Sequence, residues 1–490
     1  MPTQPLPNHP SLENLRKQAK ALRKAVSSNQ EDALLCVLEF HPRTKAAVAT
    51  FSLSDAQLVI ARRHAFESWS KLKRHVELID AYAWSGPGKS TKVHPMSPAD
   101  QFIDLACLTY ERDHTSRRDE ARALLIANPS IAAESIFSAA TVGDVSSVRR
   151  MLDRNPSLAR SRGGPRNWEP LLYAVYSRFN SALAERSTLE VVRLLLRHGA
   201  DPNAGFLWDG FYLFTALTGV FGEGESGSVN QPEHPQCNAL ARLLLDAGAD
   251  PNDNQTLYNR MFRSGTAHLE LLFEYGLGKD GNGVWFKRLG HRLDSPAQML
   301  EAQLCWAAQN NHFDRVQLLV RHGVNVNKPD IRFRRAPYEL ALRSGNAEIA
   351  QFLLDNGARQ TALTDLEAFA AACLRADSVQ ARKLLAKDPS LVDQLGAHRT
   401  ELLNAAAGED RRDAVRLMSE LRFNVNEVGR TAPLHQAAWS GHLEMVKLLI
   451  ELGADPLLRD AAHDARPIGW ARYNHKSEVV EFLEQFEPVD

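Results

Sequence analysis

The sequence predicts an all-α solenoid of helix-turn-helix units that follows a small N-terminal helical domain. The first observation is a recurring phrase: LLLRHGADPN, LLLDAGADPN, LLVRHGVNVN and LLDNGA end at Asn203, Asn252, Asn327 and Ala358. The second is its spacing, because the equivalent helix ends fall at Gly323, Gly357, Asp388, Arg422 and Gly453, in steps of 34, 31, 34 and 31 residues. A fixed period close to ~33 residues indicates stacked repeats, each of which completes its apolar core against its neighbours.

Residues 430–458, RTAPLHQAAWSGHLEMVKLLIELGADPLL, show how one such unit is built. Thr431 is suited to cap the first helix, and Pro433 suits a first helical turn, where no amide donor is needed. Gly441 lets the chain reverse before the second helix. That helix is expected to end at Gly453 in a left-handed conformation, which costs glycine little.

This unit resembles an ankyrin repeat. The resemblance is carried by Ala432-Pro433-Leu434-His435, Ala437-Ala438, Gly441, Leu448-Leu449 and Gly453-Ala454-Asp455. Weaker copies include RRAPYELALRSGNAEIAQFLLDNGA and LEAFAAACLRADSVQARKLLAKDPSL, and about eleven units can be placed between residues 101 and 490. The resemblance implies that turns and first helices form a rigid concave surface. It also implies that His435 braces a turn by hydrogen bonding to backbone.

The chain divides into regions of different pattern. The predicted regions are a disordered N-terminus (1–10), a small helical domain (11–80), a turn-rich linker (81–100), N-terminal ankyrin-like repeats (101–164), irregular repeats with long insertions (165–296) and regular ankyrin repeats (297–490). Residues 11–80 show three helical patterns. This domain is similar to a module that precedes ankyrin repeats in some bacterial proteins, which adds no activity to the prediction.

Charge and cysteine content limit the function classes. The formal net charge of −1 gives the whole chain no attraction to DNA or to an acidic membrane. Basic residues gather at 16–24, but that helix lacks aromatic residues to stack on bases or to anchor in a bilayer, so a solvated face is the favoured interpretation. Five scattered cysteines favour a reducing compartment, and the first residues lack an apolar signal core, so a cytoplasmic location is expected.

Three short motifs resemble catalytic or ligand-binding sites, but the residues around each of them do not fit such a site. Residues 222–227 spell G-x-G-x-x-G, but they follow a helix-like stretch and contain two glutamates that would repel a phosphate. Gly88-Lys89-Ser90 lacks the earlier glycine of a phosphate loop, since residue 83 is Ala83. His234 and Cys237 supply a single pair of metal ligands without a second pair. The sequence therefore predicts a non-enzymatic protein without a cofactor or metal ion.

The residue after the Ala-Ala pair is expected to face the concave surface of an ankyrin array. Alignment on Trp439 gives Thr141, Tyr176, Gln309, Arg343 and Tyr473 as its counterparts. Tyr, Trp and Arg dominate binding energy at protein interfaces. The predicted function is that of an intracellular scaffold or adaptor, a monomer that binds an unidentified protein. The alternative for Trp439 is sideways packing on the neighbouring repeat.

A second hypothesis places function in the irregular half. The insertions at 178–188, 206–212 and 222–237 extend consecutive repeats, and insertions in solenoids often decorate the binding face. Trp208, Asp209, Tyr212 and His234 are the residues that would form a small-ligand or catalytic pocket if their side chains converge.

Overall fold

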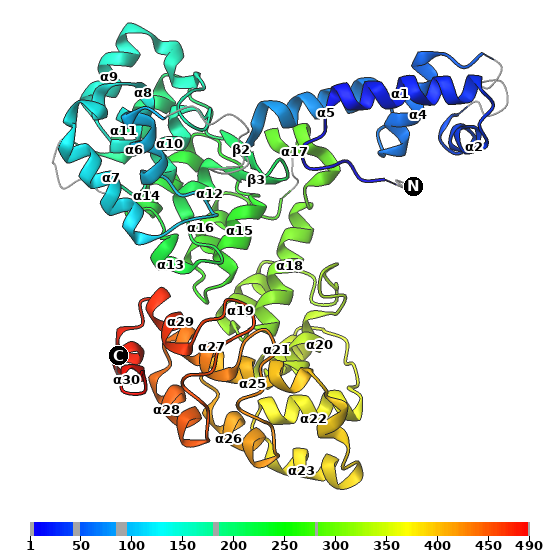
Figure 1. The fold of residues 1–490 in the computed structure, drawn as a ribbon, viewed down its shortest axis with the longest axis vertical. Coiled ribbons are helices and arrows are strands. Elements are labelled where there is room, and N and C mark those ends of the chain that lie inside the picture. The colour runs from blue at the N-terminus through cyan, green and yellow to red at the C-terminus, as the bar shows by residue number, and fades with distance from the viewer. Residues whose placement is uncertain (1–3, 43–49, 85–95, 180–185, 280–282, 489–490) are drawn as a thin grey trace. The chain divides into compact units, whose positions relative to one another are not determined.

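Pairs of short helices joined by tight turns make up most of the computed structural model, which describes residues 4–42, 50–84, 96–179, 186–279 and 283–488. The predicted helical repeat fold is therefore confirmed. The chain divides into an N-terminal unit (residues 1–260 and 271–295) and a C-terminal unit (residues 261–270 and 296–490). Figure 1 labels the helices and strands of both units.

The C-terminal unit is a regular array. Its first helices are α18 (Pro296–Gln309), α20 (Pro337–Arg343), α22 (Asp365–Leu374), α25 (His398–Gly408), α27 (Pro433–Ser440) and α29 (Pro467–Tyr473). Its second helices are α19 (Phe313–Arg321), α21 (Ala347–Asp355), α23 (Ser378–Lys387), α26 (Arg412–Glu420), α28 (Leu443–Glu451) and α30 (Ser477–Glu484), with a short α24 (Leu391–Gln394) between α23 and α25. Each first helix packs on the next one in chain order. We call the surface that these helices expose the first-helix face.

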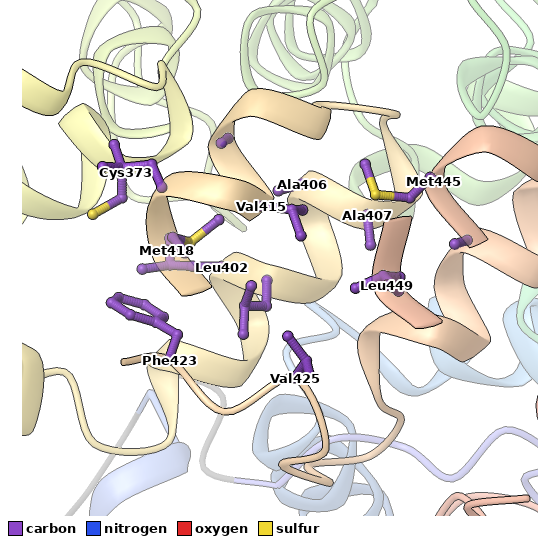
Figure 2. Packing of buried hydrophobic residues seen from close by; sticks show 14 of the residues in the cluster. Cys373, Leu402, Ala406, Ala407, Val415, Met418, Phe423, Val425, Met445 and Leu449 are labelled. Carbon is purple, nitrogen blue, oxygen red and sulfur yellow. The ribbon is translucent and has the colours of Figure 1, made fainter. Parts of the chain in front are cut away.

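One apolar core runs through the last repeats. Figure 2 shows side chains of α25, α26 and α28 meeting Phe423 and Val425, which come from the turn after α26. Met418 and Leu449 are fully buried among them. A single repeat cannot bury these side chains alone, and they become buried only between neighbouring repeats. The hydrophobic effect therefore holds the array together.

The turns explain the sequence phrases. Gly441 and Gly453 adopt φ values of 81° and 91°, as expected from their positions at helix ends. His435 is fully buried, and its Nε2 lies 3.0 Å from the Ala465 carbonyl oxygen of the next turn, so the bracing role is confirmed. Thr431 does not cap α27: the N-cap is Ala432, and the Thr431 hydroxyl instead accepts hydrogen bonds from neighbouring side chains.

Within the part of the chain that the structure describes, the N-terminal unit begins with α1 (Leu12–Ser27), α2 (Glu31–Phe40), α4 (Leu53–Arg63) and α5 (Trp69–Tyr82). The last predicted pattern splits because Ser52 caps α4 and Ser68 caps α5, each through its side chain. The core of this small domain contains Leu15, Ala19, Ala56, Ile60, Ala61, Leu72 and Val76.

The structure describes residues 4–10 of the N-terminal segment predicted to be disordered, and residues 1–3 lie outside the described part. Leu6 packs against the core of the helical domain. The His64 ring donates from Nδ1 to the Gln4 carbonyl oxygen at 2.8 Å, and Ser11 caps α1. These contacts connect residues 4–11 to the helical domain.

The rest of the N-terminal unit carries the irregular repeats. Its helices are α6 (Pro98–Ala106), α7 (Thr115–Ala127), α8 (Ile136–Val142), α9 (Val145–Arg154), α10 (Pro170–Tyr176), α11 (Thr188–Arg197), α12 (Ala216–Phe221), α13 (Gly227–Asn230), α14 (Cys237–Asp246), α15 (Asn254–Met261, to residue 260), α16 (Ala267–Glu274, from residue 271) and α17 (Val284–Leu289). Short 3-10 turns cover Pro129–Ala133, Pro156–Arg160 and Gly290–Arg292.

A small sheet departs from the all-α prediction. Strand β2 (Gly205–Trp208) pairs antiparallel with β3 (Tyr212–Thr215), and β1 (Ala83–Trp84) pairs parallel with β2. The predicted linker 81–100 therefore supplies the end of α5, a strand and the start of α6, while its residues 85–95, including Gly88, lie outside the described part. The alternation of aromatic and aliphatic residues in 206–214 favours a strand pair.

Candidate functional site

Two residues of the predicted ladder, Trp439 and Tyr473, come together at the end of the C-terminal unit. The rings of Trp439 and Tyr473 stack, with centroids 5.9 Å apart and an interplanar angle of 20°. Trp470 stands edge-on to Trp439 at 5.5 Å. We call these three residues the aromatic patch. Trp439 packs sideways on the next repeat, as its alternative interpretation held, yet it stays half-buried, and Tyr473 is 46% exposed.

The surroundings of the aromatic patch fix it in place. The Asn474 amide donates to the Trp439 carbonyl oxygen at 2.7 Å, and the Trp470 indole donates to the Asp460 carboxylate at 2.7 Å. In the preceding repeat, the position equivalent to Trp439 is Gly408. A Cβ atom there would meet only Gln436 and Ser440, at ordinary contact distances. The patch is thus a rigid aromatic surface that has a glycine as its neighbour on one side.

The two other predicted residues of this unit lie on the same face. Arg343 pairs with Glu367 of α22, and Arg335 pairs with Glu339, so charged groups of neighbouring repeats neutralise one another there. Gln309 is half-buried, at the end of α18. The first-helix face therefore changes from an ion-paired region at α20 and α22 to an aromatic region at α27 and α29.

The ladder does not extend into the N-terminal unit, where the expectation of exposed residues is wrong. Tyr176 and Thr141 are buried. The Tyr176 hydroxyl donates to the Thr215 carbonyl oxygen at 2.8 Å, and its ring contacts Phe206 and Trp168. The β2–β3 hairpin, formed by residues of the second insertion, covers the position. Neither side chain has a surface to offer a partner.

The hairpin residues serve to hold the chain's own N-terminal segments. The Trp208 indole donates to the Thr109 carbonyl oxygen at 3.1 Å. The Asp209 carboxylate lies 3.4 Å from both the Asn8 amide and the His9 ring nitrogen, and the Asp209 amide donates to the Trp84 carbonyl oxygen at 2.8 Å. Tyr212 is half exposed and packs edge-on against Phe211. Asp209 is therefore a structural contact of the N-terminal segment.

His234 does not join these residues in an open pocket. It is 5% exposed, and its Nδ1 accepts a hydrogen bond from the Gln236 amide at 3.0 Å. Part of the first insertion, residues 180–185, lies outside the described part. The contacts of Asp209 and His234 give the pocket hypothesis no support, because one side chain holds the N-terminal segment and the other faces the protein interior.

The glycine-rich stretch 222–227 is a structural crossing. Gly222, Glu223 and Gly224 have φ values of 59°, 55° and 145°. Glu223 is buried and forms an ion pair with Arg260 at 3.0 Å. Arg260 therefore neutralises the Glu223 carboxylate within this turn.

In the described ranges, His, Cys, Asp and Glu side chains nowhere gather in threes around a point that could hold a metal ion. None of the helices in those ranges combines the length and the apolar character that a bilayer crossing demands.

The burial of His234 makes a testable prediction about pH. Burial, together with the Arg178 charge, lowers the pKa of His234 to about 3. Between pH ~6.5 and that value the unfolded chain binds a proton that the folded chain does not, so the free energy of unfolding falls as pH falls. In His234→Asn, which keeps a hydrogen-bond acceptor, we expect the N-terminal unit to lose less stability between pH 7 and 4, by about 3 kcal/mol. Urea unfolding at both pH values measures this.

Glu169 provides the control with the opposite sign. Its burial and the nearby Asp201 carboxylate raise the pKa of Glu169 to about 7. Protonated Glu169 favours the folded state. This contribution to the free energy of unfolding is fully present below pH ~4.5 and is lost as pH rises to 7. In Glu169→Gln, the free energy of unfolding should therefore fall more steeply than in wild type as pH is lowered from 7 to 4. In His234→Asn it should fall less steeply than in wild type. Equal slopes in wild type and His234→Asn would contradict the assignment.

Comparison with known proteins gives matches over parts of the chain. The family model for three-copy ankyrin repeats matches residues 290–364 and 369–460, and the model for a single ankyrin repeat matches residues 166–205. The chain is similar to a palmitoyltransferase, Hip14 of Drosophila melanogaster, with 42% identity over 73 residues, which are 14% of this chain and 12% of that protein. It is also similar to the palmitoyltransferase AKR1 of Lachancea kluyveri, with 30% identity over 185 residues, which are 34% of this chain and 25% of that protein. The chain thus spans a quarter or less of the length of these relatives.

Proposed function

Because the chain contains ankyrin repeats at residues 166–205, 290–364 and 369–460, we propose that it is a protein-binding adaptor that captures its partner on the first-helix face of the C-terminal unit. The observation that carries this proposal is the aromatic patch of Trp439, Trp470 and Tyr473. Stacked aromatic side chains that retain exposed surface are the usual centres of binding energy at protein interfaces.

The fixed geometry of the patch supports binding. Trp439 is held by stacking on Tyr473 and by the hydrogen bond from Asn474 to its backbone. Side chains that are ordered before association lose little conformational entropy when a partner arrives. The buried counterparts in the N-terminal unit, Tyr176 and Thr141, expose no surface to a partner, so we assign the binding role to the C-terminal unit.

The proposed role is binding without catalysis. The two relatives are named palmitoyltransferases, but the shared stretches are 12% and 25% of their lengths. The family models that match this chain describe repeats, and they carry no reaction of their own. We propose a cytoplasmic site of action, which the five free cysteines, four of them buried, favour.

The proposal predicts that Trp439→Ala combined with Tyr473→Ala abolishes partner capture. Removal of both rings takes away the centre of the interface, where single truncations cost ~2 kcal/mol or more, equivalent to about 30-fold in affinity. The full-length chain and the double variant are each immobilised and exposed to extract of the native cell. Retained proteins are identified by mass spectrometry, and the dissociation constant of the recovered partner is then measured.

Val379→Ala is the matched control. Val379 is an apolar side chain, 79% exposed, on the second helix α23 and therefore off the first-helix face. This variant should retain every partner that wild type retains. Hydrogen exchange of α27 and α29 confirms that the double variant stays folded. Retention of the same proteins by a folded double variant would reject the proposed function.

A further inference from the structure

Three of the turns that precede the first helices of the C-terminal unit carry exposed cations without acidic partners, whereas the turns before α25 and α29 carry the exposed carboxylates Asp393 and Asp455. Arg334, Arg359 and Arg430 precede α20, α22 and α27, and all three are exposed. Among the described residues, none of the three guanidinium groups lies within 4.0 Å of a carboxylate oxygen. An exposed guanidinium keeps its five donors available for an incoming carboxylate.

The acidic side chains of the same turns are already neutralised. Residues 322–336, 356–364 and 421–432 contain two carboxylates, Asp330 and Glu427. Asp330 pairs with Arg332 at 3.1 Å, and Glu427 lies 3.6 Å from Arg399. The charge that these turns leave uncompensated is therefore positive, although the whole chain has a formal net charge of −1.

The positive turns and the aromatic patch belong to one stack. The first helices α20, α22, α25, α27 and α29 pack on one another in chain order, so the turns that precede them follow one another along one edge of the array. Arg430 lies three residues before Pro433, the first residue of α27, which carries Trp439. Arg334 and Arg359 continue the positive edge away from the aromatic patch.

We infer that the partner presents an extended acidic segment with one large apolar side chain. This inference rests on the proposed function and names the chemistry of its partner. The apolar side chain covers the aromatic patch beside Gly408, and carboxylates of the same segment pair with Arg430, Arg359 and Arg334. Arginine pairs with carboxylates through parallel hydrogen bonds, which fixes the direction and register of the segment. An extended strand of protein advances by about 3.3 Å per residue, so a segment of a dozen residues is long enough to pass several neighbouring turns.

A nucleic acid fits these observations less well. Each phosphate that a protein neutralises adds affinity for a nucleic acid, and that affinity falls steeply with salt. The exposed cations of these turns, among them Lys328, Arg334, Arg359, Arg422 and Arg430, are spread over three turns, and the aromatic patch lies at the opposite end of the first helices. The acidic protein segment is therefore the partner that the charges favour, and an oligonucleotide becomes one arm of the test.

The test uses the full-length chain and fluorescein-labelled twelve-residue peptides. The first peptide consists of Asp, Glu and Ser around a central Leu-Phe pair. The second has lysine in place of every acidic residue, and the third has Ala-Ala in place of Leu-Phe. Fluorescence anisotropy should show at least tenfold tighter binding of the first peptide than of the other two. A twelve-nucleotide single-stranded DNA should bind more weakly than the first peptide.

Variants then assign the contacts. Arg430→Glu should weaken binding of the first peptide at least fivefold, and Lys383→Glu, a charge reversal on the second helix α23, should leave it unchanged. Equal or tighter binding of the lysine peptide or of the DNA overturns the inference. The captured partner is also cross-linked to the chain, which identifies the segment of it that lies on the array. If capture from extract depends on Trp439 and Tyr473 but this segment is basic or uncharged, the inference fails and the proposed function stands. If capture does not depend on those two residues, the proposed function fails as well.

Discussion

Replacement of Arg166 by alanine is expected to lower the free energy of unfolding of the N-terminal unit by about 3 kcal/mol. The Arg166 side chain is 1% exposed and forms an ion pair with Asp104 at 3.0 Å. The guanidinium also donates to the carbonyl oxygens of Leu108 at 2.8 Å and Cys107 at 3.2 Å. Truncation leaves the Leu108 carbonyl oxygen without a donor, and the Cys107 carbonyl oxygen keeps only a long contact with Arg117 at 3.5 Å. A buried acceptor without a donor costs ~1–3 kcal/mol.

The aromatic neighbours of Arg166 add to the loss. Its guanidinium carbon lies 4.8 Å from the ring centroids of both Trp84 and Trp168. Trp84 belongs to β1, which joins the helical domain to the β2–β3 hairpin, and Trp168 stacks on Phe206 of that hairpin at 4.3 Å. A desolvated cation–π contact is worth ~2 kcal/mol. The variant should therefore loosen both the hairpin and the attachment of the helical domain.

Hydrogen exchange measured by mass spectrometry is the suitable readout, because a chain with two units need not unfold in a single transition. Peptides from α6 and α10 should exchange at least 100-fold faster in Arg166→Ala. Arg122→Ala is the control, since Arg122 is 56% exposed and its contact with Asp119 at 3.7 Å is worth less than ~1 kcal/mol. Unchanged exchange in α6 and α10 of Arg166→Ala would show that the buried pair contributes little.

The repeat architecture could be predicted from the sequence because its signals are local and periodic. Gly441 and Gly453 mark helix ends by a backbone conformation that glycine adopts cheaply, and His435 marks a turn that it braces. The period survives even where the glycine is absent, since Arg422 takes a φ of 68° at the same position. Local rules of this kind need no knowledge of distant contacts.

The small sheet and the buried half of the ladder could not be predicted in this way. Strand β1 has two residues, and its partner Leu207 lies more than 120 positions along the chain. The burial of Tyr176 depends on Phe206, which folds back from a later insertion. Alignment of repeats gives the direction in which a side chain points, and it does not reveal what an insertion places over that side chain. Trp439 differs because regular repeats surround it.

One departure from the repeat pattern did carry a signal in the sequence. Alignment of the second helices places Arg315 with Ile349, Ala414 and Met445, which are buried apolar residues in their own repeats. An arginine in a core position of this kind has to find buried acceptors. In the structure it is fully buried and donates to the carbonyl oxygens of the chain segment 261–265.

Arg315→Met is accordingly expected to destabilise the start of the C-terminal unit by about 3 kcal/mol or more. Methionine fills much of the same volume, but it leaves the Gly265 carbonyl oxygen, now 2.9 Å from a guanidinium nitrogen, without a donor. The Met261 carbonyl oxygen loses the guanidinium at 3.0 Å and keeps only the Trp306 indole, also at 3.0 Å. The loss should be local, because α27 to α30 complete their own core farther along the stack. Hydrogen exchange should therefore rise in α18 and α19 and stay unchanged in α28.

Arg321→Met is the matched control for this second prediction, since Arg321 lies two turns later on α19 and its side chain is exposed. The control should change exchange in α18 and α19 by less than twofold, because an exposed arginine at this place buries little and satisfies no buried carbonyl group. If both variants behave alike, the carbonyl contacts of Arg315 are dispensable, and stacking of the helices alone holds residues 261–265. If exchange rises equally in α18 and α28 of Arg315→Met, the repeats unfold as one cooperative block and the assumption of nearest-neighbour stability is wrong for this array.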